Sequence, residues 1–200
     1  MTTQPEDILE LFERTGAYLR GHFRLTSGLH SPEYIQCALV LQYPEHAERL
    51  GGELAAKLRE ILPSTAVDVV ASPAVGGLII GHEVARALGA RFLFAERGSE
   101  GRMTLRRGFA VQPGESAVVV EDVVTTGGST REVVDVLKAA GARVLAAGSV
   151  VDRSGGEAEV GATRTALVTL RVVAHPPEDC PLCRSGVPVA KPGSRPDQTR

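Results

Sequence analysis

Two adjacent carboxylates, Glu121 and Asp122, stand directly before a run of hydroxyl and glycine residues. The stretch Val118–Thr130 reads VVVEDVVTTGGST, and a helix is expected to start near Ser129. Glycines let the backbone approach a ligand closely, and a helix start offers free N–H groups and partial positive charge. No lysine follows the glycines, and no GxGxxG pattern is present. The stretch therefore predicts a cradle for one phosphate, not a triphosphate or dinucleotide loop.

The two carboxylates need a separate explanation, because they would repel a phosphate. They precede the cradle by one short turn, which is about the reach of a sugar ring. A carboxylate accepts hydrogen bonds well from adjacent hydroxyls, and it stabilises positive charge that develops at an anomeric carbon. Glu121 and Asp122 are therefore expected to contact ribose hydroxyls, beside the phosphate site.

The elements around this stretch follow a regular alternation. Short, almost continuously apolar runs are typical of parallel strands that are buried on both faces, and helical patterns lie between them. Such an order predicts right-handed βαβ units in an open α/β sheet. The expected strands are 67–72, 91–96, 117–122, 144–152 and 165–173, and the expected helices are 45–62, 77–89 and 129–141, with another starting at Pro5.

The bulk composition is that of one ordinary globular domain. The 200 residues are 43% hydrophobic and carry a formal net charge of −2. That balance favours neither nucleic acid nor a membrane surface as a partner. The N-terminus lacks the apolar run of a signal peptide, and no stretch approaches bilayer length. A cytoplasmic protein is expected.

Two regions depart from the alternation. Residues 96–116 are long, polar and glycine-bearing, and are expected to form a functional or mobile loop. The tail from Pro176 is rich in proline and glycine, and its last residues are expected to be disordered. Within it, Cys180 and Cys183 form a CxxC pair for which His175 is the only metal-ligand candidate near in sequence. A reduced or bridged pair that closes a turn is favoured over a structural metal.

VVVEDVVTTGGST resembles the phosphoribosyl pyrophosphate (PRPP) signature of the type I phosphoribosyltransferases. Further segments, GHFRLTSGLHSPEYIQ, ASPAVGGLIIG, VVDRSGG and CPLCRSGVPVAKPGSR, resemble parts of the orotate phosphoribosyltransferase family. The resemblance covers roughly residues 5–195. It implies a mostly parallel central sheet flanked by helices, with a small hood from the N-terminal segment and a C-terminal extension. The expected organisation is a single domain over 1–200, with helix and hood at 1–43, core at 44–175 and extension at 176–200.

The resemblance also implies roles for individual positions. Glu121 and Asp122 would bind the ribose hydroxyls, with Asp122 nearest the reacting carbon. Arg153 would pair with the orotate carboxylate, which suits the planar fork of an arginine. Tyr34 and Ile35 would present backbone to the pyrimidine, although a plain packing role for Tyr34 stays open. The implied PRPP-binding residues are Glu121, Asp122, Val123, Val124, Thr125, Thr126, Gly127, Gly128 and Ser129, the pyrophosphate loop with Ser72, Ala74 and Gly76, and Arg97, Arg106 and Arg107; Thr125 would also approach orotate.

The chain departs from the family at its basic positions. Many members carry a lysine where this chain has Thr26, and another at the position of Val75 or Gly76. Their mobile catalytic loop bears lysine and histidine, whereas residues 97–112 here offer only arginines. Which of these arginines, Arg97, Arg102, Arg106 or Arg107, reaches the ligand is left open.

The implied reaction is displacement of pyrophosphate from PRPP by orotate, which gives orotidine 5′-monophosphate. Mg²⁺ is the expected cofactor, held mainly by PRPP and water with no direct protein ligand. The 97–112 loop is expected to be a lid that closes over the neighbouring subunit's site in a homodimer. A purine phosphoribosyltransferase and a PRPP-sensing regulator of the same fold are the alternatives, but neither terminus adds a basic nucleic-acid-binding element.

Overall fold

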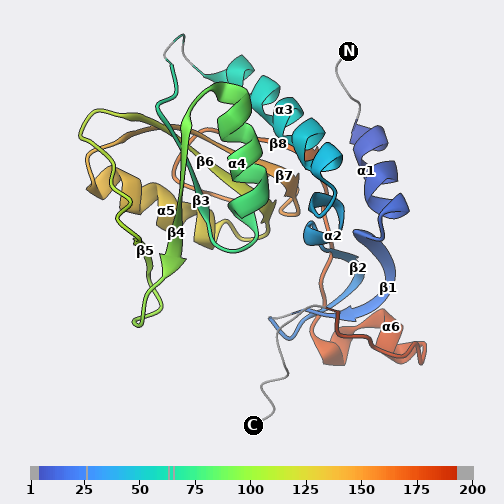
Figure 1. Cartoon of the computed structure of the whole chain (residues 1–200). Coiled ribbons are helices and arrows are strands. Elements are labelled where there is room, and N and C mark those ends of the chain that lie inside the picture. Colours follow the sequence, from blue (N-terminus) through green and yellow to red (C-terminus); the bar gives the residue numbers. More distant parts are fainter. Residues whose placement is uncertain (1–4, 26, 63, 65, 193–200) are drawn as a thin grey trace.

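A six-stranded sheet forms the centre of the computed structural model, which describes residues 5–25, 27–62, 64 and 66–192 (Figure 1). Its strand order is β5-β4-β3-β6-β7-β8, and every neighbouring pair is parallel except β4 with β5. The mostly parallel α/β sheet predicted from the sequence is confirmed. The strands are β3 (Val69–Pro73), β4 (Arg91–Arg97), β5 (Met103–Leu105), β6 (Ser116–Val124), β7 (Arg143–Asp152) and β8 (Arg164–Thr169).

The apolar runs are explained by helices on both faces of this sheet. Alternate residues of β6 belong to different cores: Val118 and Val120 pack with α3 (Pro44–Ile61) and α4 (Gly77–Leu88), and Val119 packs with α5 (Gly128–Ala139). Figure 1 shows the two groups of helices on opposite sides of the strands. Because helices cover both faces, both sets of side chains are mainly apolar.

A small antiparallel hairpin stands beside the sheet and forms the predicted hood. It consists of β1 (Tyr18–Arg24) and β2 (His30–Ile35), between α1 (Pro5–Arg14) and the short helix α2 (Ala38–Leu41). The C-terminal extension packs on this hood, with η1 (Pro177–Asp179) and α6 (Pro181–Arg184) next to β1 and β2 (Figure 1).

Backbone hydrogen bonds join the extension to the hood at two places. His30 and His175 exchange N–H···O bonds of 2.8 Å in each direction. Farther along, Arg24 donates to the carbonyl of Ala190, and Ala190 donates to the carbonyl of His22, both at 2.8 Å. The two ends of the chain therefore make one substructure.

Three sequence expectations need correction or restriction. Residues 96–116 are not wholly a loop, because β5 pairs with the end of β4 and its Met103 is buried against the α5 side of the core. His175 is not the histidine beside the CxxC pair; the side chains of His22 and His30 are. The expected disorder of the last residues concerns 193–200, which lie outside the described residues, as does Thr26.

The described part of the chain contains no helix that is long and apolar enough to cross a bilayer.

Candidate active site

The loop that the sequence predicts to be a phosphate cradle lies between β6 and α5. Strand β6 ends at Val124, and α5 begins at Gly128, one residue earlier than expected. Of the two glycines, only Gly127 has a positive φ, of 79°. A Cβ at this position would also lie 2.9 Å from Cγ1 of Val160, so both the backbone angle and the packing require glycine here. The loop and the free amides of α5 surround a cavity of about 140 Å³, lined by Glu121 and residues 123–130.

The acid pair lies at the end of β6, with different surroundings for its two members. Glu121 is buried, and the Thr130 hydroxyl donates to its Oε2 at 3.4 Å, whereas Asp122 is half-buried. Burial raises the pKa of Glu121 to about 9, with a further contribution from repulsion by Asp122. Burial also raises the pKa of Asp122. The pair therefore retains a proton at neutral pH. Sugar hydroxyls or a cation would stabilise the ionised form, which burial keeps away from water.

The loop between β3 and α4 lies directly against Asp122. A Cβ added to Gly76 would be 2.6 Å from Oδ1 and 2.8 Å from Oδ2 of Asp122, so glycine is required for this contact. The peptide bond between Ala74 and Val75 is cis. Ala74 donates its N–H to the carbonyl of Ala95 at 2.8 Å. The amides from Val75 to Gly77, at the start of α4, are therefore the donors that this loop can offer a ligand.

Ser72, also predicted to bind PRPP, has its side chain under α4. It is fully buried, and a Cβ on Gly81 would lie 2.0 Å from its Oγ. Only the backbone of Ser72 can therefore face a ligand in this loop.

Arg153 follows β7 and lines a second cavity, of about 430 Å³, together with Thr125 and Thr126. Its Nε is buried and has no hydrogen-bond partner among the described residues. Burial lowers the pKa of this guanidinium. The negative charge of Glu33 and the interaction with Tyr34 act in the opposite direction and raise it. A half-buried guanidinium whose Nε lacks a partner among the described residues can hold an anionic group, and a carboxylate matches its planar fork.

Asp152 positions the turn that carries Arg153, and the sequence analysis did not single it out. It is buried, forms an ion pair with Arg164, and accepts hydrogen bonds from the Ser154 amide at 2.8 Å and the Ser154 hydroxyl at 2.6 Å. Burial would raise the pKa of Asp152, but these partners outweigh burial and lower it. The amide of Arg153 itself donates to the carbonyl of Val124 at 2.8 Å, which ties the turn to the end of β6.

The hood brings Tyr34 and Ile35 to the same side of the molecule as Arg153. The charge of Arg153 acts on the pKa of Tyr34, which burial nevertheless raises overall. Ile35 is buried in the core shared with α3 and α4. Cys37, two residues farther on, donates its thiol to the carbonyl of Asp122 at 3.9 Å. This contact links the end of the hood to the acid pair, and no signal in the sequence pointed to it.

The arginines of the predicted lid are not gathered at either cavity. Arg97 pairs with Glu132 at 2.9 and 3.1 Å. Arg106 and Arg107 both pair with Glu96, at 3.1 and 3.0 Å. All three are largely exposed on the β4–β5 side, and none lines the cavities at residues 121–130 or at Arg153. Their predicted contact with PRPP stays a prediction.

Comparison with known proteins places this arrangement in a family. The family model for the phosphoribosyl transferase domain matches residues 41–178. An orotate phosphoribosyltransferase of Pelotomaculum thermopropionicum is 54% identical over 190 residues, which are 95% of this chain and 97% of that one. A second, from Thermotoga petrophila, is 52% identical over 94% of this chain and 98% of its own length. The chain belongs to the orotate phosphoribosyltransferase family.

A solved structure supports the same assignment at the level of the fold. The crystal structure of orotate phosphoribosyltransferase from Aeropyrum pernix has a TM-score of 0.64 and 28% identity, and covers 82% of this chain and 94% of that one. The type I phosphoribosyltransferase fold expected from the signature is thereby confirmed. The family model begins at residue 41, after β1 and β2, whereas the two orotate phosphoribosyltransferases match 95% and 94% of the chain.

Proposed function

We propose that this chain transfers the phosphoribosyl group of PRPP to a ring nitrogen of orotate. The products are orotidine 5′-monophosphate and pyrophosphate. The proposal combines the family membership with a site in which a phosphate cradle, an acid pair and a half-buried guanidinium lie next to one another; the Nε of that guanidinium has no partner among the described residues.

The β6–α5 loop would hold the 5′-phosphate through the amides and hydroxyls of Thr125 to Ser129. This places the ribose over Glu121 and Asp122, whose carboxylates accept hydrogen bonds from its hydroxyls. As the bond to pyrophosphate breaks, C1 becomes cationic, and Asp122 at the exposed end of the pair stabilises that charge. Because burial raises the pKa of both carboxyl groups, substrate binding releases a proton from the pair.

The environment of Arg153 favours orotate as the acceptor. Its Nε is buried without a partner among the described residues, and its side chain helps to line the cavity to which Thr125 also contributes. Orotate carries a carboxylate that would pair with this group, whereas uracil and the purine bases carry none. A purine acceptor would leave the guanidinium buried and unpaired, which is costly.

The pyrophosphate would lie at the β3–α4 loop, with Mg²⁺ bound mainly to its oxygens and to water. The donor set fits such an ion, because Mg²⁺ prefers oxygen ligands and often needs only one or two carboxylates in addition to phosphate groups. Asp122 lies against Gly76 of this loop, so ribose and pyrophosphate would meet at that contact. Bound Mg²⁺ supplies charge neutralisation for the leaving group.

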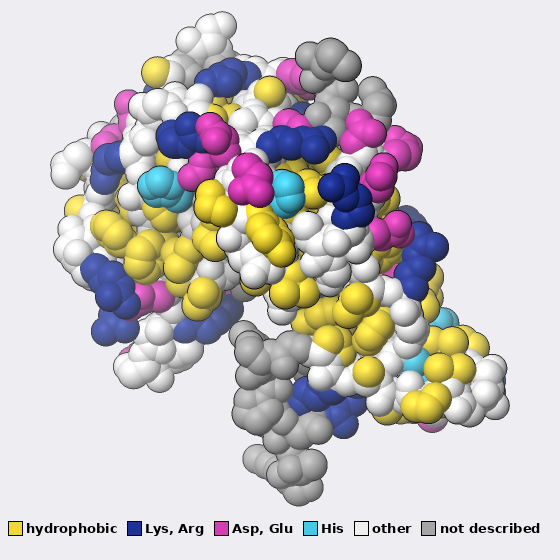
Figure 2. Space-filling model, turned by 45° about the vertical axis from the view of Figure 1, so that its right-hand side comes forward, with side chains coloured by type: hydrophobic (Ala, Val, Ile, Leu, Met, Phe, Trp, Pro, Cys, Tyr) yellow, Lys and Arg dark blue, Asp and Glu magenta, His cyan; other side chains and the backbone are white. Residues whose placement is uncertain are grey.

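The active form is proposed to be a homodimer in which each lid covers the partner's site. Large apolar side chains are exposed around the β3–α4 loop and α2, where Val75, Ile79, Leu39 and Tyr43 are 79%, 45%, 38% and 43% exposed. Figure 2 shows hydrophobic side chains collected below a band of mixed charges on one face. An interface here would cover them. Since Arg97, Arg106 and Arg107 line neither cavity of their own subunit, the lid positions favour a role in the neighbouring site.

The experiment that tests the function is turnover of orotate with PRPP and Mg²⁺, with uracil and the purine bases in parallel. Consumption of orotate alone supports the proposal, and consumption of a purine overturns the role of Arg153. For the lid, Asp122→Asn is mixed with Arg106→Ala/Arg107→Ala, two variants that are each expected to be nearly inactive. Shared sites predict recovered activity on mixing, because one site of each mixed dimer is intact. If no activity is recovered, lid sharing is overturned, and the proposed reaction is unaffected.

A further inference from the structure

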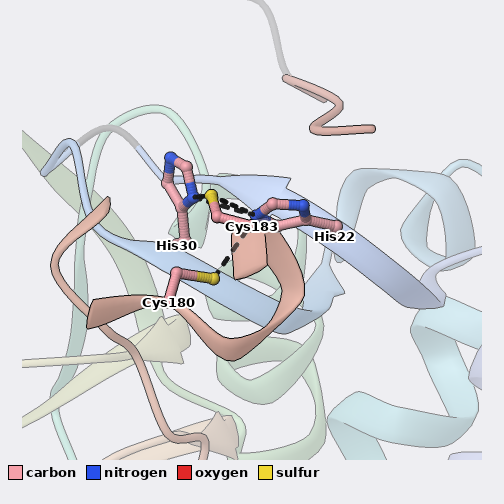
Figure 3. A group of neighbouring side chains, drawn as sticks. All are labelled: His22, His30, Cys180 and Cys183. Atoms are coloured by element: carbon pink, nitrogen blue, oxygen red, sulfur yellow. Dashed lines mark hydrogen bonds between the residues drawn. The ribbon is translucent and has the colours of Figure 1, made fainter. Parts of the chain in front are cut away.

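Four side chains of the types that bind transition metals, two histidines and two cysteines, converge where the C-terminal extension meets the hood. His22 lies on β1, His30 begins β2, Cys180 precedes α6 and Cys183 lies within it. Their nearest nitrogen and sulfur atoms all lie within 4.8 Å of one another. Figure 3 shows the two imidazoles and two thiols pointing toward a common centre from the hairpin and from the short helix.

The spacing of four of the six atom pairs is close to the edges of a small tetrahedron, and all six pairs lie within 4.8 Å. Ordinary zinc–nitrogen and zinc–sulfur bond lengths give edges of about 3.3 Å between two nitrogens and about 3.6 Å between nitrogen and sulfur. Here His22 Nε2 and His30 Nδ1 are 2.9 Å apart. Cys180 Sγ is 3.5 Å and Cys183 Sγ 3.7 Å from His22 Nε2, and Cys183 Sγ is 3.3 Å from His30 Nδ1. Bringing the four atoms to their positions around a metal needs shifts of only a few tenths of an ångström for these pairs.

The hydrogen bonding of His22 orients it as a ligand. Its Nδ1 lies 2.7 Å from the carbonyl oxygen of Val187. A carbonyl only accepts, so Nδ1 carries the proton and the lone pair of Nε2 points into the cluster. A ligating histidine that donates its other N–H to a backbone carbonyl is the usual supporting arrangement in metal sites. Val187 belongs to the same extension that supplies the two cysteines.

We propose that His22, His30, Cys180 and Cys183 bind one zinc ion as a closed structural site. Two thiolates and two imidazoles in tetrahedral array select zinc among the common divalent ions, and four protein ligands leave no open position for chemistry. Three of the four side chains are buried, so the site is shielded from solvent on most sides. This zinc is separate from the Mg²⁺ expected with PRPP, because Tyr34 and Ile35, not the cluster, lie at the active-site end of β2.

The zinc would fasten a substructure that has little core of its own. The β1–β2 hairpin is two-stranded, and α6 has only four residues, so neither is stable by itself. A metal that joins positions 22 and 30 to positions 180 and 183 closes a long loop and contributes its binding energy to folding. Because β2 also carries Tyr34 and Ile35, the zinc positions the part of the hood that is proposed to meet orotate.

The first test measures metal directly in the whole protein. Wild type purified with a thiol reductant and excess Zn²⁺, then freed of loose metal, should hold about one zinc per chain. Replacement by Co²⁺ should give the strong visible bands of tetrahedral cobalt together with a sulfur-to-metal charge-transfer band. Failure of the reduced protein to retain either metal overturns the proposal. So does isolation of a Cys180–Cys183 disulfide that takes up no metal after reduction.

Variants then assign the ligands. Cys183→Ser and His22→Ala should each lower zinc affinity by at least about 10-fold and weaken the cobalt bands. Cys37→Ser removes one thiol outside the cluster, and His82→Ala removes an exposed imidazole on α4, so both should keep the metal. Loss of zinc in the two controls, or full retention in the two cluster variants, overturns the assignment.

The positioning role rests on the proposed function and has its own measurement. Cys183→Ser should raise the KM for orotate several-fold while the Kd for PRPP changes by less than about 2-fold, because only the hood is loosened. Equal losses for both substrates would overturn the positioning role and leave the zinc site, which the metal measurements decide independently.

Discussion

The phosphate cradle and the cysteine–histidine cluster are built in opposite ways. The cradle uses consecutive residues of one strand–loop–helix unit, 118–130, and the residues that line its cavity are mostly threonine, serine and glycine. The cluster joins side chains that are up to 161 positions apart, on three elements that the chain reaches at its two ends. A local site can be read as a motif, whereas a distributed site exists only after the ends of the chain have met.

The two regions are nevertheless connected through the hood. Strand β2 begins at His30 in the cluster and ends at Ile35, beside Tyr34. Two residues later, the Cys37 thiol reaches the carbonyl of Asp122. A substitution in the cluster should therefore change the affinity for orotate more than the binding of PRPP at the phosphate cradle.

The largest effect should come from Asp122→Asn in the local site. The kcat should fall by about 10²- to 10⁴-fold, because the carboxylate charge acts mainly when C1 is cationic, while the Kd for PRPP changes little. Steady-state kinetics and calorimetric PRPP binding measure the two quantities. Asp135→Asn, on the exposed side of α5, is the matched control. Zinc content should be unchanged in both; equal losses in kcat and PRPP affinity would refute the assigned role.

Arg153→Ala should have the next largest effect, directed at the acceptor. The KM for orotate should rise about 100-fold, since a charge-assisted, partly buried pair is lost, and PRPP binding should persist. Arg153→Lys should recover only part of the loss, because lysine lacks the planar fork. Arg49→Ala, on the surface of α3, controls for removal of a positive charge. A variant that loses PRPP affinity as strongly as orotate affinity would show that Arg153 belongs to the cradle instead.

Gly76→Ala tests the contact between the pyrophosphate loop and the acid pair. The new Cβ would lie 2.6 Å from Asp122 Oδ1, so the carboxylate or the loop must move. We expect kcat/KM for PRPP to fall about 10-fold or more, with a loss of about 1–3 kcal/mol in the free energy of unfolding. Gly52→Ala in α3 is the control, because its Cβ meets no atom within 4 Å, and alanine there should stabilise by about 1 kcal/mol. Unchanged kinetics in Gly76→Ala would separate this loop from the site.

The most gradual effect, with no direct change in catalysis, is a pH dependence of stability at Glu121. Its pKa is about 9 in the folded chain and near the ordinary 4.5 when unfolded. Its contribution to stability is therefore complete below about pH 4.5 and declines as the pH rises toward 9, by at most about 1.4 kcal/mol per pH unit. Urea unfolding of wild type and Glu121→Gln across this range measures it. The stability of the variant relative to wild type should increase with pH, and a constant difference would contradict the buried, protonated state.

Much of the fold was predictable because its signals are local. Continuous apolar runs indicated strands buried on both faces, and the observed cores of Val118, Val119 and Val120 explain why no alternation was present. The short strand β5 was missed because three residues with one polar member carry too little pattern, and its place is set by pairing with β4. In the site, Asp152 and Cys37 were missed for the same reason: their importance lies in partners, not in their own neighbours along the chain.

By itself, the sequence predicted the parallel sheet and a loop suited to a phosphate after two carboxylates, and its resemblance to known segments indicated the family. The sheet and the loop follow from periodicity, backbone freedom and consecutive functional groups, which are properties of short segments. Only the tertiary structure decided that the buried Nε of Arg153 lacks a partner among the described residues, that Asp122 lies against Gly76, and that His22 and His30 meet Cys180 and Cys183. Those facts depend on desolvation and distance between separate elements, and neither exists until the chain has folded.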